Sequence, residues 1–195
     1  MGAASLLAYL RRQRKNPSAC PYGLRFSLDL PHPFVTRPRL REMLSPEPGQ
    51  RVLEVGPGTG YYVLQAARWL EPGGTLDILD IQQEMLDHTM HRARAMGVLN
   101  IVPRLGDAQT LPYPDDHFDS AYLVATLGEV PDKGRALREL RRVLKSGGRL
   151  VVGEVLLDPH KVTFEELCSL TEAGGLDHER TLKGALGYFA AFQAM

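Results

Sequence analysis

The feature that most constrains the fold is the sequence VLEVGPGTG at residues 52–60. An apolar strand runs directly into a glycine-rich turn, and a segment with helical periodicity follows at 62–70. Glycine adopts backbone dihedrals that are closed to other residues and lets a ligand approach the backbone closely. The N-terminus of the helix that follows offers free N–H groups and a partial positive charge. The segment therefore predicts a strand–turn–helix unit that binds a ligand at the end of a sheet.

After residue 50, short apolar runs alternate with helical segments. Strands are predicted at 51–55, 75–80, 101–105, 118–124, 149–156, near 176–181 and at 186–192. Helices are predicted at 62–70, 83–96, 133–144 and 163–173, with a helical turn or two at 37–44 and a turn-rich loop at 107–116. Strands that alternate with helices are joined by crossovers and run parallel, so the pattern predicts a doubly wound α/β sheet.

The spacing of the glycines bears on the kind of ligand. The dinucleotide fingerprint GxGxxG needs a last glycine that allows the helix to pack closely on the strand. Counted from Gly56 that position is Tyr61, and counted from Gly58 it is Val63, so both frames fail. A bulky residue disfavours a pyrophosphate without excluding it. A nicotinamide-linked oxidoreductase on a Rossmann-like sheet is therefore kept as an alternative.

Two acidic residues follow the next two strands. Asp80 ends the second strand, 20 residues after Gly60, where a carboxylate can accept both hydroxyls of an adenosine ribose. A helix N-cap is the alternative role for Asp80. Asp107, in the sequence GDA after the third strand, can hydrogen-bond an adenine amino group or form a turn. The loop and the two acids together predict a binding site for an adenosine-containing ligand.

The first 47 residues differ from the rest of the chain. Residues 16–36 are rich in proline and aromatic side chains, a composition that breaks regular structure, and a short helix is predicted at 3–15. Residues 1–45 carry a net charge of +6, which the remaining residues balance with −6. We interpret 1–47 as a basic and aromatic arm or lid and 48–195 as the ligand-binding domain. The arm either lies on the acidic domain or contacts an anionic lipid surface or an acidic partner, which leaves peripheral membrane contact open.

Composition and charge argue against several other classes of protein. A net charge of zero over 195 residues argues against general nucleic-acid binding. Cys20 and Cys168 lack the spacing of a zinc site or a disulfide framework, so we expect no metal and two reduced thiols. No stretch approaches the ~20 apolar residues of a membrane span, and the apolar run at 3–10 precedes its charges, unlike a signal peptide. We expect a cytoplasmic protein, either a monomer or a homodimer.

Four segments occur in order over about residues 48–156: VLEVGPGTG, LDIQQEML, GDAQTLPYPDDHFD and LRELRRVLKSGGRLVV. They resemble the class I S-adenosylmethionine (SAM)-dependent methyltransferases, and most closely the group with the ubiquinone/menaquinone C-methyltransferases and the type 11 methyltransferases. The resemblance implies in-line transfer of a methyl group from SAM to a small-molecule acceptor, apolar or quinone-like. It also implies a seven-stranded Rossmann-like sheet of order 3-2-1-4-5-7-6, with an antiparallel seventh strand and helices on both faces.

The resemblance also assigns residues to the cofactor. The family's cofactor-binding positions are matched by Glu54, Gly56, Pro57, Gly58, Thr59, Gly60, Asp80, Ile81, Asp107, Ala108 and Val124. By this match Ile81 lies against adenine, Asp107 and Ala108 form the adenine edge, and Val124 lies beside the methionine part of SAM. Glu54 matches the acid that orders the loop or reaches the SAM amino group through water.

The acceptor site is less clearly marked. After the fourth strand the chain reads TLGEV at 126–130, where many type 11 members carry a histidine pair. Candidate acceptor-site residues are Glu129 in this loop and Tyr22 and His32 in the aromatic segment, with a helix cap near Asp132 as the alternative for Glu129 and simple packing as the alternative for His32. Because the sulfonium is already a good leaving group, a base is needed only if the acceptor must lose a proton. A non-catalytic SAM-binding protein on the methyltransferase fold is a further alternative.

Overall fold

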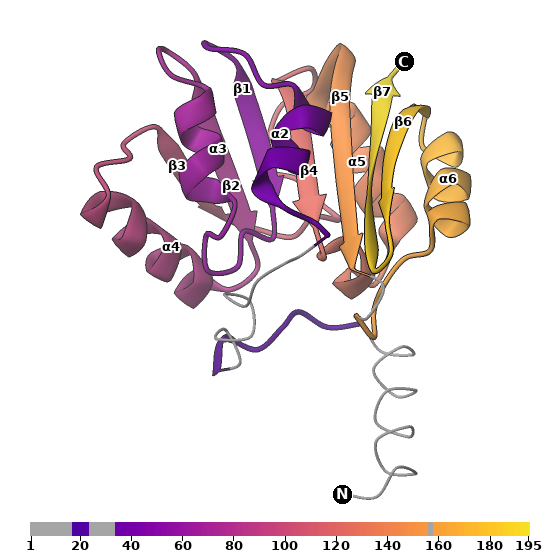
Figure 1. Cartoon of the computed structure of the whole chain (residues 1–195), viewed down its shortest axis with the longest axis horizontal. Helices are drawn as coiled ribbons and strands as arrows, with labels where there is room; N and C mark the ends of the chain where they lie inside the picture. The colour runs from indigo at the N-terminus through magenta and orange to yellow at the C-terminus, as the bar shows by residue number, and fades with distance from the viewer. Residues whose placement is uncertain (1–16, 24–33, 156–157) are drawn as a thin grey trace, which may run out of the picture.

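The computed structural model describes residues 17–23, 34–155 and 158–195. A seven-stranded sheet of order β3-β2-β1-β4-β5-β7-β6 forms the centre of the molecule, with helices on both of its faces (Figure 1). Strands β1 to β5 pair in parallel, whereas β7 lies antiparallel between β5 and β6. The predicted doubly wound sheet, its strand order and its antiparallel seventh strand are confirmed.

The bounds of the elements follow the sequence pattern closely. The strands are β1 (Arg51–Val55), β2 (Thr75–Asp80), β3 (Ile101–Leu105), β4 (Phe118–Val124), β5 (Leu144–Val155), β6 (Leu176–Gly184) and β7 (Gly187–Ala194). The helices are α2 (Arg37–Leu44), α3 (Val63–Trp69), α4 (Gln83–Ala95), the 3-10 helix η2 (Leu127–Glu129), α5 (Lys133–Val143) and α6 (Phe164–Ala173). The helix predicted at 3–15 lies outside the described residues.

Strand β5 differs most from its prediction, since it begins at Leu144 and not at Arg149. Leu144 pairs with Phe118 of β4, and the register then shifts before Arg149 pairs with Ser120. The polar, glycine-containing sequence KSGG at 145–148 occupies this irregularity. A polar segment of that kind is typical of a turn. The pairing of Leu144 with β4 nevertheless extends the strand through it.

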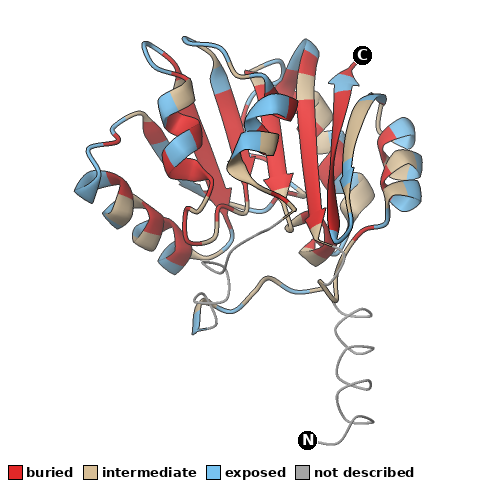
Figure 2. Ribbon diagram, viewed as in Figure 1, coloured by how far each residue is buried: buried red, intermediate tan, exposed pale blue. Residues whose placement is uncertain are grey.

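Two apolar layers hold the helices on the sheet, and Figure 2 shows the buried residues along the strands and on the sheet-facing sides of the helices. One layer joins α5 and α6 to one face, and the other joins α2, α3 and α4 to the opposite face. On α5 the buried residues are Ala136, Leu137, Leu140 and Val143, which fall on one side of a helix. Burying each leucine contributes about 2 kcal/mol.

Helix α2 belongs to the segment that we interpreted as an arm, yet it packs on the sheet. Its residues Leu40, Met43 and Leu44 are buried, and the helix contacts β5 and β7 on the face opposite α5 and α6. The division of the chain at residue 47 stays a prediction. Within the residues that the structure describes, no helix is long and apolar enough to span a bilayer.

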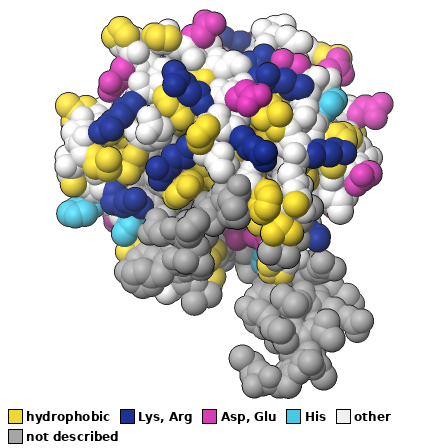
Figure 3. Space-filling view, viewed as in Figure 1, with side chains coloured by type: hydrophobic (Ala, Val, Ile, Leu, Met, Phe, Trp, Pro, Cys, Tyr) yellow, Lys and Arg dark blue, Asp and Glu magenta, His cyan; other side chains and the backbone are white. Residues whose placement is uncertain are grey.

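Basic side chains are spread over the face that carries α2 and α3. In Figure 3 the described Lys and Arg side chains on this face lie among acidic and apolar ones and form no continuous stripe. Binding to a nucleic-acid backbone depends on basic side chains gathered along one surface. The expectation that the protein does not bind nucleic acid stays a prediction.

Candidate functional site

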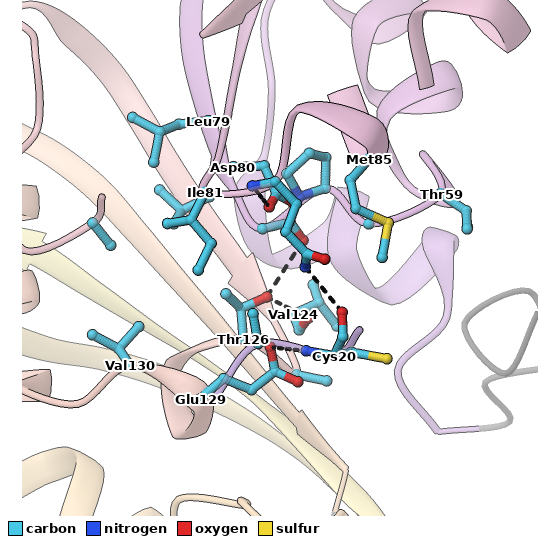
Figure 4. A pocket seen from close by; sticks show the side chains of 18 of the residues that line it. Cys20, Thr59, Leu79, Asp80, Ile81, Met85, Val124, Thr126, Glu129 and Val130 are labelled. Atoms are coloured by element: carbon cyan, nitrogen blue, oxygen red, sulfur yellow. Dashed lines mark hydrogen bonds between the residues drawn. The ribbon is translucent and has the colours of Figure 1, made fainter. Parts of the chain in front are cut away.

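A cavity opens where the parallel strands end, at the point between β1 and β4 where the strand order reverses. In open α/β sheets this switch point is the usual place for a ligand. The cavity wall is formed by the loop after β1, the end of β2, the loop after β3, the end of β4 with η2, the end of β5 and part of the segment 17–23. Figure 4 shows the side chains from these elements converging on one space.

The loop after β1 can take its shape only with glycine at its first position. Gly56 has a φ of +71°, and a Cβ atom there would lie 2.4 Å from Cγ2 of Thr126. The Gly56 N–H donates to the carbonyl of Leu79 at the end of β2, at 2.9 Å. The backbone of the loop is thereby held between β2 and the end of β4, and it lines the cavity.

Helix α4 supports the same loop from its other side. The Thr89 hydroxyl donates to the Gly58 carbonyl at 3.0 Å, and the Arg92 guanidinium donates to the Thr59 carbonyl at 2.7 Å. Sequence reasoning missed both donors. Their spacing of three residues places them on one side of the predicted helix 83–96, but nothing in that spacing shows which loop they contact.

Asp80 lies at the end of β2, is 8% exposed and lines the cavity. Its Oδ1 accepts the N–H of Gln82 at 2.9 Å. Burial raises the pKa of the Asp80 carboxyl, and the N–H groups of Gln82, Gly58 and Ile81 lower it in part. The N-cap of α4 is Gln82, so Asp80 contributes to the start of the helix through this one N–H and still faces the cavity.

Glu54 is buried beside the loop and does not line the cavity. The Tyr122 hydroxyl of β4 donates a hydrogen bond to its carboxylate. Burial raises the pKa of Glu54 to about 8, although the bond from Tyr122 lowers it and the charge of Asp80 raises it further. Gly60 also lies outside the cavity wall, whereas Pro57, Gly58 and Thr59 belong to it. The roles of Glu54 and Gly60 toward a cofactor stay predictions.

The loop after β3 brings Asp107 and Ala108 to the same cavity, as the end of β2 brings Ile81 and the end of β4 brings Val124. Asp107 is exposed, and its Oδ1 accepts the N–H of Gln109 at 2.8 Å. The Thr110 N–H donates to the Asp107 carbonyl at 2.9 Å. Asp107 therefore forms the turn that the sequence allowed and also faces the cavity.

The three acceptor-site candidates have different outcomes. Glu129 is half-buried in η2 and lines the cavity. Its suggested capping role is wrong, because Asp132 is the N-cap of α5 and accepts the Arg135 N–H at 2.8 Å. Tyr22 lies outside the cavity wall, with its ring 6.3 Å from that of His88 on α4. His32 lies outside the described residues.

Residues 17–23 contribute Ala19 and Cys20 to the cavity wall and are held by hydrogen bonds on both sides. The side-chain amide of Gln82 donates to the Cys20 carbonyl at 2.9 Å and accepts the Tyr22 N–H at 3.2 Å. On the opposite side, the Cys20 N–H donates to the Glu129 carboxylate at 3.3 Å (Figure 4). We call residues 17–23 the strap. Gln82 was missed in the sequence, where a polar residue before a helix carries no sign of this contact.

The residues of the cavity fit SAM. The glycine turn brings its backbone to the cavity wall, where a ligand can approach it closely, and a Cβ atom at Gly56 would clash with the Thr126 side chain. Asp80 presents a buried carboxylate to the cavity, and Ile81 and Ala108 add apolar surface, while their roles toward a cofactor stay predictions. The fold and this site together define the class of SAM-dependent methyltransferases.

Comparison with known proteins identifies the family. The model of the ubiE/COQ5 methyltransferase family matches residues 31–168, and the chain belongs to this family. The similarity predicted from the four ordered segments is thereby confirmed, and membership of a SAM-dependent family sets the nicotinamide alternative aside.

Individual relatives agree with this result. The ubiquinone/menaquinone biosynthesis C-methyltransferase UbiE of Vibrio campbellii is 40% identical over 122 residues, which cover 60% of this chain and 47% of that protein. Methyltransferase GfsG of Streptomyces halstedii is 32% identical over 148 residues, covering 72% and 52%. The chain thus spans about half the length of these relatives. The crystal structure of a SAM-dependent methyltransferase from Aquifex aeolicus has the same fold, with a TM-score of 0.83, 21% identity, and coverage of 91% of this chain and all of that one.

Proposed function

We propose that this chain transfers a methyl group from SAM to a small-molecule acceptor. One observation carries the proposal: the glycine turn, Asp80 and Asp107 line the same cavity as Glu129 and the strap. A cavity with cofactor-type contacts at one end and a separate apolar end can hold two molecules side by side. Methyl transfer needs that arrangement, because its rate depends mainly on bringing the acceptor atom close to the methyl carbon.

The cofactor end would be held by residues that the structure brings together. The backbone of Gly56 and Gly58 would face the amino-acid part, Asp80 would accept the ribose hydroxyls, and Ala108 would contact the adenine. Val124 would lie beside the methionine chain. When bound, SAM supplies a methyl group on a positively charged sulfur, which leaves as a neutral thioether. The chain itself then has to orient the acceptor and exclude water.

The strap supports the exclusion of water. It is bonded to Gln82 at the start of α4 and to Glu129 in η2, and its residues Ala19 and Cys20 form part of the cavity wall between these contacts. Ordering these groups over a bound ligand would keep solvent from the reacting atoms. We therefore extend the predicted lid role of the N-terminal arm to the strap in particular.

The side chains that line the cavity favour an apolar acceptor. Besides Glu129, the cavity is lined by Val35, Val124, Val130 and Val155, and Val130 directly follows η2. Side chains of this kind favour a flat hydrophobic molecule. The name of the Vibrio campbellii relative gives ubiquinone and menaquinone biosynthesis as its role, which supports a quinone-like acceptor here. Cytoplasmic location, peripheral membrane contact and oligomeric state stay predictions.

Two measurements test the proposal. Isothermal titration calorimetry with SAM and with NADH checks the cofactor, and we expect SAM alone to bind. Transfer of radiolabelled methyl from SAM to 1,4-dihydroxynaphthalene, a reduced quinone, under anaerobic conditions then checks catalysis. Binding of NADH in place of SAM would contradict the whole proposal. Binding of SAM without methyl transfer to this or any other acceptor would favour the non-catalytic alternative.

A further inference from the structure

The carboxylate of Glu129 lies at the acceptor end of the cavity, on a backbone that is closely fixed. Gly128 packs so tightly under the loop after β5 that a Cβ atom there would lie 1.8 Å from the His160 carbonyl oxygen. Ala125, which starts the turn into η2, has a φ of +52°, and its N–H donates to the Gly153 carbonyl at 2.8 Å. Strained backbone of this kind persists only where the surrounding structure holds it, and it is typical of functional sites.

The contacts of Glu129 leave part of its carboxylate available to a ligand. Its Oε2 accepts the Cys20 N–H at 3.3 Å, and within the described residues Oε1 accepts no hydrogen bond and no cation pairs with the group. The neighbouring wall is apolar, with Val124, Val130 and Val155. An acid placed this way can accept a proton from a molecule that enters beside it.

The electrostatic surroundings agree with that role. Burial raises the pKa of Glu129 to about 7, while the Cys20 N–H lowers it and the charges of Asp158 and Asp80 raise it further. His160, whose carbonyl packs on Gly128, belongs to the same loop as Asp158. A general base works best when its pKa lies near the pH at which the enzyme operates.

We propose that Glu129 is the catalytic base that takes the proton from a hydroxyl-bearing acceptor of the phenol or enol type, an inference that rests on the proposed function. The O–H bond of the acceptor breaks and its proton passes to the Glu129 carboxylate. The electron pair released on the acceptor forms the new bond to the methyl carbon, either from oxygen or through the conjugated ring carbon; in the second case that carbon then loses its own proton to solvent and the oxygen regains one, which restores the aromatic ring. The carbon–sulfur bond of the sulfonium breaks with its electron pair on sulfur, and Glu129 afterwards returns the proton to solvent.

A neutral acceptor suits this position better than an ammonium group. An ammonium would enter the cavity as a second positive charge next to the sulfonium, and it would still have to lose a proton before its nitrogen could react. A phenol enters uncharged and becomes nucleophilic as its proton moves to the base. Its flat ring also fits the apolar wall around η2.

The first test measures binding and needs no turnover. The full chain is saturated with S-adenosylhomocysteine, the product form of the cofactor, and titrated with 1-naphthol or with 1-methoxynaphthalene, which lacks the hydroxyl proton. Above about pH 8 the wild type should prefer 1-naphthol by roughly tenfold or more, since a hydrogen bond to a charged group is at stake. The preference should shrink as the pH falls below about 6. In Glu129→Gln it should be much smaller and independent of pH.

Control variants separate the role of Glu129 from loss of structure and from loss of charge. Glu129→Gln should give the far-UV circular dichroism spectrum and the cooperative thermal unfolding of the wild type, which shows that it is folded. Glu172→Gln removes one negative charge from an exposed position on α6 and should keep the wild-type preference for 1-naphthol.

The second test is methyl transfer to 1,4-dihydroxynaphthalene over a range of pH. We expect the wild-type kcat to rise through about pH 7, and Glu129→Gln to lose this rise together with about 10²–10⁴-fold in rate. Equal preference for the two naphthalene probes in the wild type, absence of binding to both, or a wild-type pH profile in Glu129→Gln would overturn the role of Glu129. Failure to bind S-adenosylhomocysteine or SAM would instead overturn the proposed function on which it rests.

Discussion

Gly56 and Thr126 lie so close that a Cβ atom on residue 56 would be 2.4 Å from Cγ2 of the threonine, although 70 residues separate them in the chain. The contact brings the loop after β1 and the end of β4 together at the centre of the cavity. Glycine is therefore favoured at position 56 for two separate reasons: its φ is positive, and there is no space for a Cβ atom.

We expect Gly56→Ala to weaken SAM binding by at least about tenfold, because the left-handed backbone conformation alone costs a non-glycine residue about 1–2 kcal/mol. The double variant Gly56→Ala/Thr126→Ala removes both Cγ2 and Oγ1, which would lie 2.4 and 2.5 Å from the new Cβ atom, and it should recover only part of the affinity, since the backbone strain remains. Calorimetric titration of both variants with SAM checks this. Full recovery in the double variant would show that space alone matters.

Asp80→Ala should lower the affinity for SAM by one to a few orders of magnitude. The variant would lose charge-assisted hydrogen bonds to the ribose hydroxyls, each of about 1.5–3 kcal/mol. Asp177→Ala, which removes a carboxylate from an exposed position on β6, is the matched control and should bind SAM like the wild type. Wild-type affinity in Asp80→Ala, measured by calorimetry, would contradict ribose binding by this residue.

Gln82→Ala should release SAM several-fold faster, because the strap loses both of its hydrogen bonds with the Gln82 side-chain amide. The neighbouring residue Gln83 supplies the control: its side chain is exposed and bonds Asp87 on its own helix. Stopped-flow displacement of bound SAM gives the dissociation rates. If Gln82→Ala and Gln83→Ala behave alike, the strap does not hold the cofactor in place.

The buried acid Glu154 should make the protein less stable as the pH rises. Burial raises its pKa to about 8, above the value of 4.5 in an unfolded chain, so folding takes up a proton between these two pH values. The free energy of unfolding should therefore fall through that window, by up to about 1.4 kcal/mol per pH unit for this group, and level off above it. Glu54 has a similarly raised pKa and adds to the effect.

Urea unfolding of Glu154→Gln at several pH values checks this prediction. The variant should be more stable than the wild type at the alkaline end and should show a shallower dependence on pH. The exposed Glu172→Gln should keep the wild-type slope. An unchanged slope in Glu154→Gln would mean that Glu154 is ionised in the folded protein or titrates normally.

The sequence predicted the parts of the molecule that depend on local pattern. The residues of a strand such as β1, which is apolar and followed by glycine, are enough to predict it. The same is true of an amphipathic helix such as α5. The strand order, in contrast, was predicted from the family resemblance. Asp80 could be placed at the cavity because the end of a parallel strand fixes its position relative to the glycine turn.

Contacts between distant segments could not be predicted in this way. The bonds of Gln82 to the strap and of Tyr122 to Glu54 depend on side-chain directions that only the packed structure determines. Tyr22 was a reasonable acceptor candidate by composition, but its backbone N–H bonds Gln82 and its ring contacts His88, away from the cavity wall. Strand β5 was predicted too short, because the pairing of Leu144 with Phe118 overrides the polar sequence that follows.

The strand order reverses between β1 and β4, and the cavity at this point is lined by two groups of elements. Strands β1 to β3 and their loops present the residues predicted to contact the cofactor, and η2, the end of β5 and the strap supply further parts of the cavity wall. Glu129 and Val130 belong to the short connection after β4 and not to a strand, so substitutions there leave the pairing of the strands in place. Proteins with this fold can therefore differ in the residues that meet the acceptor, through one short turn, while they keep the residues predicted to bind the cofactor.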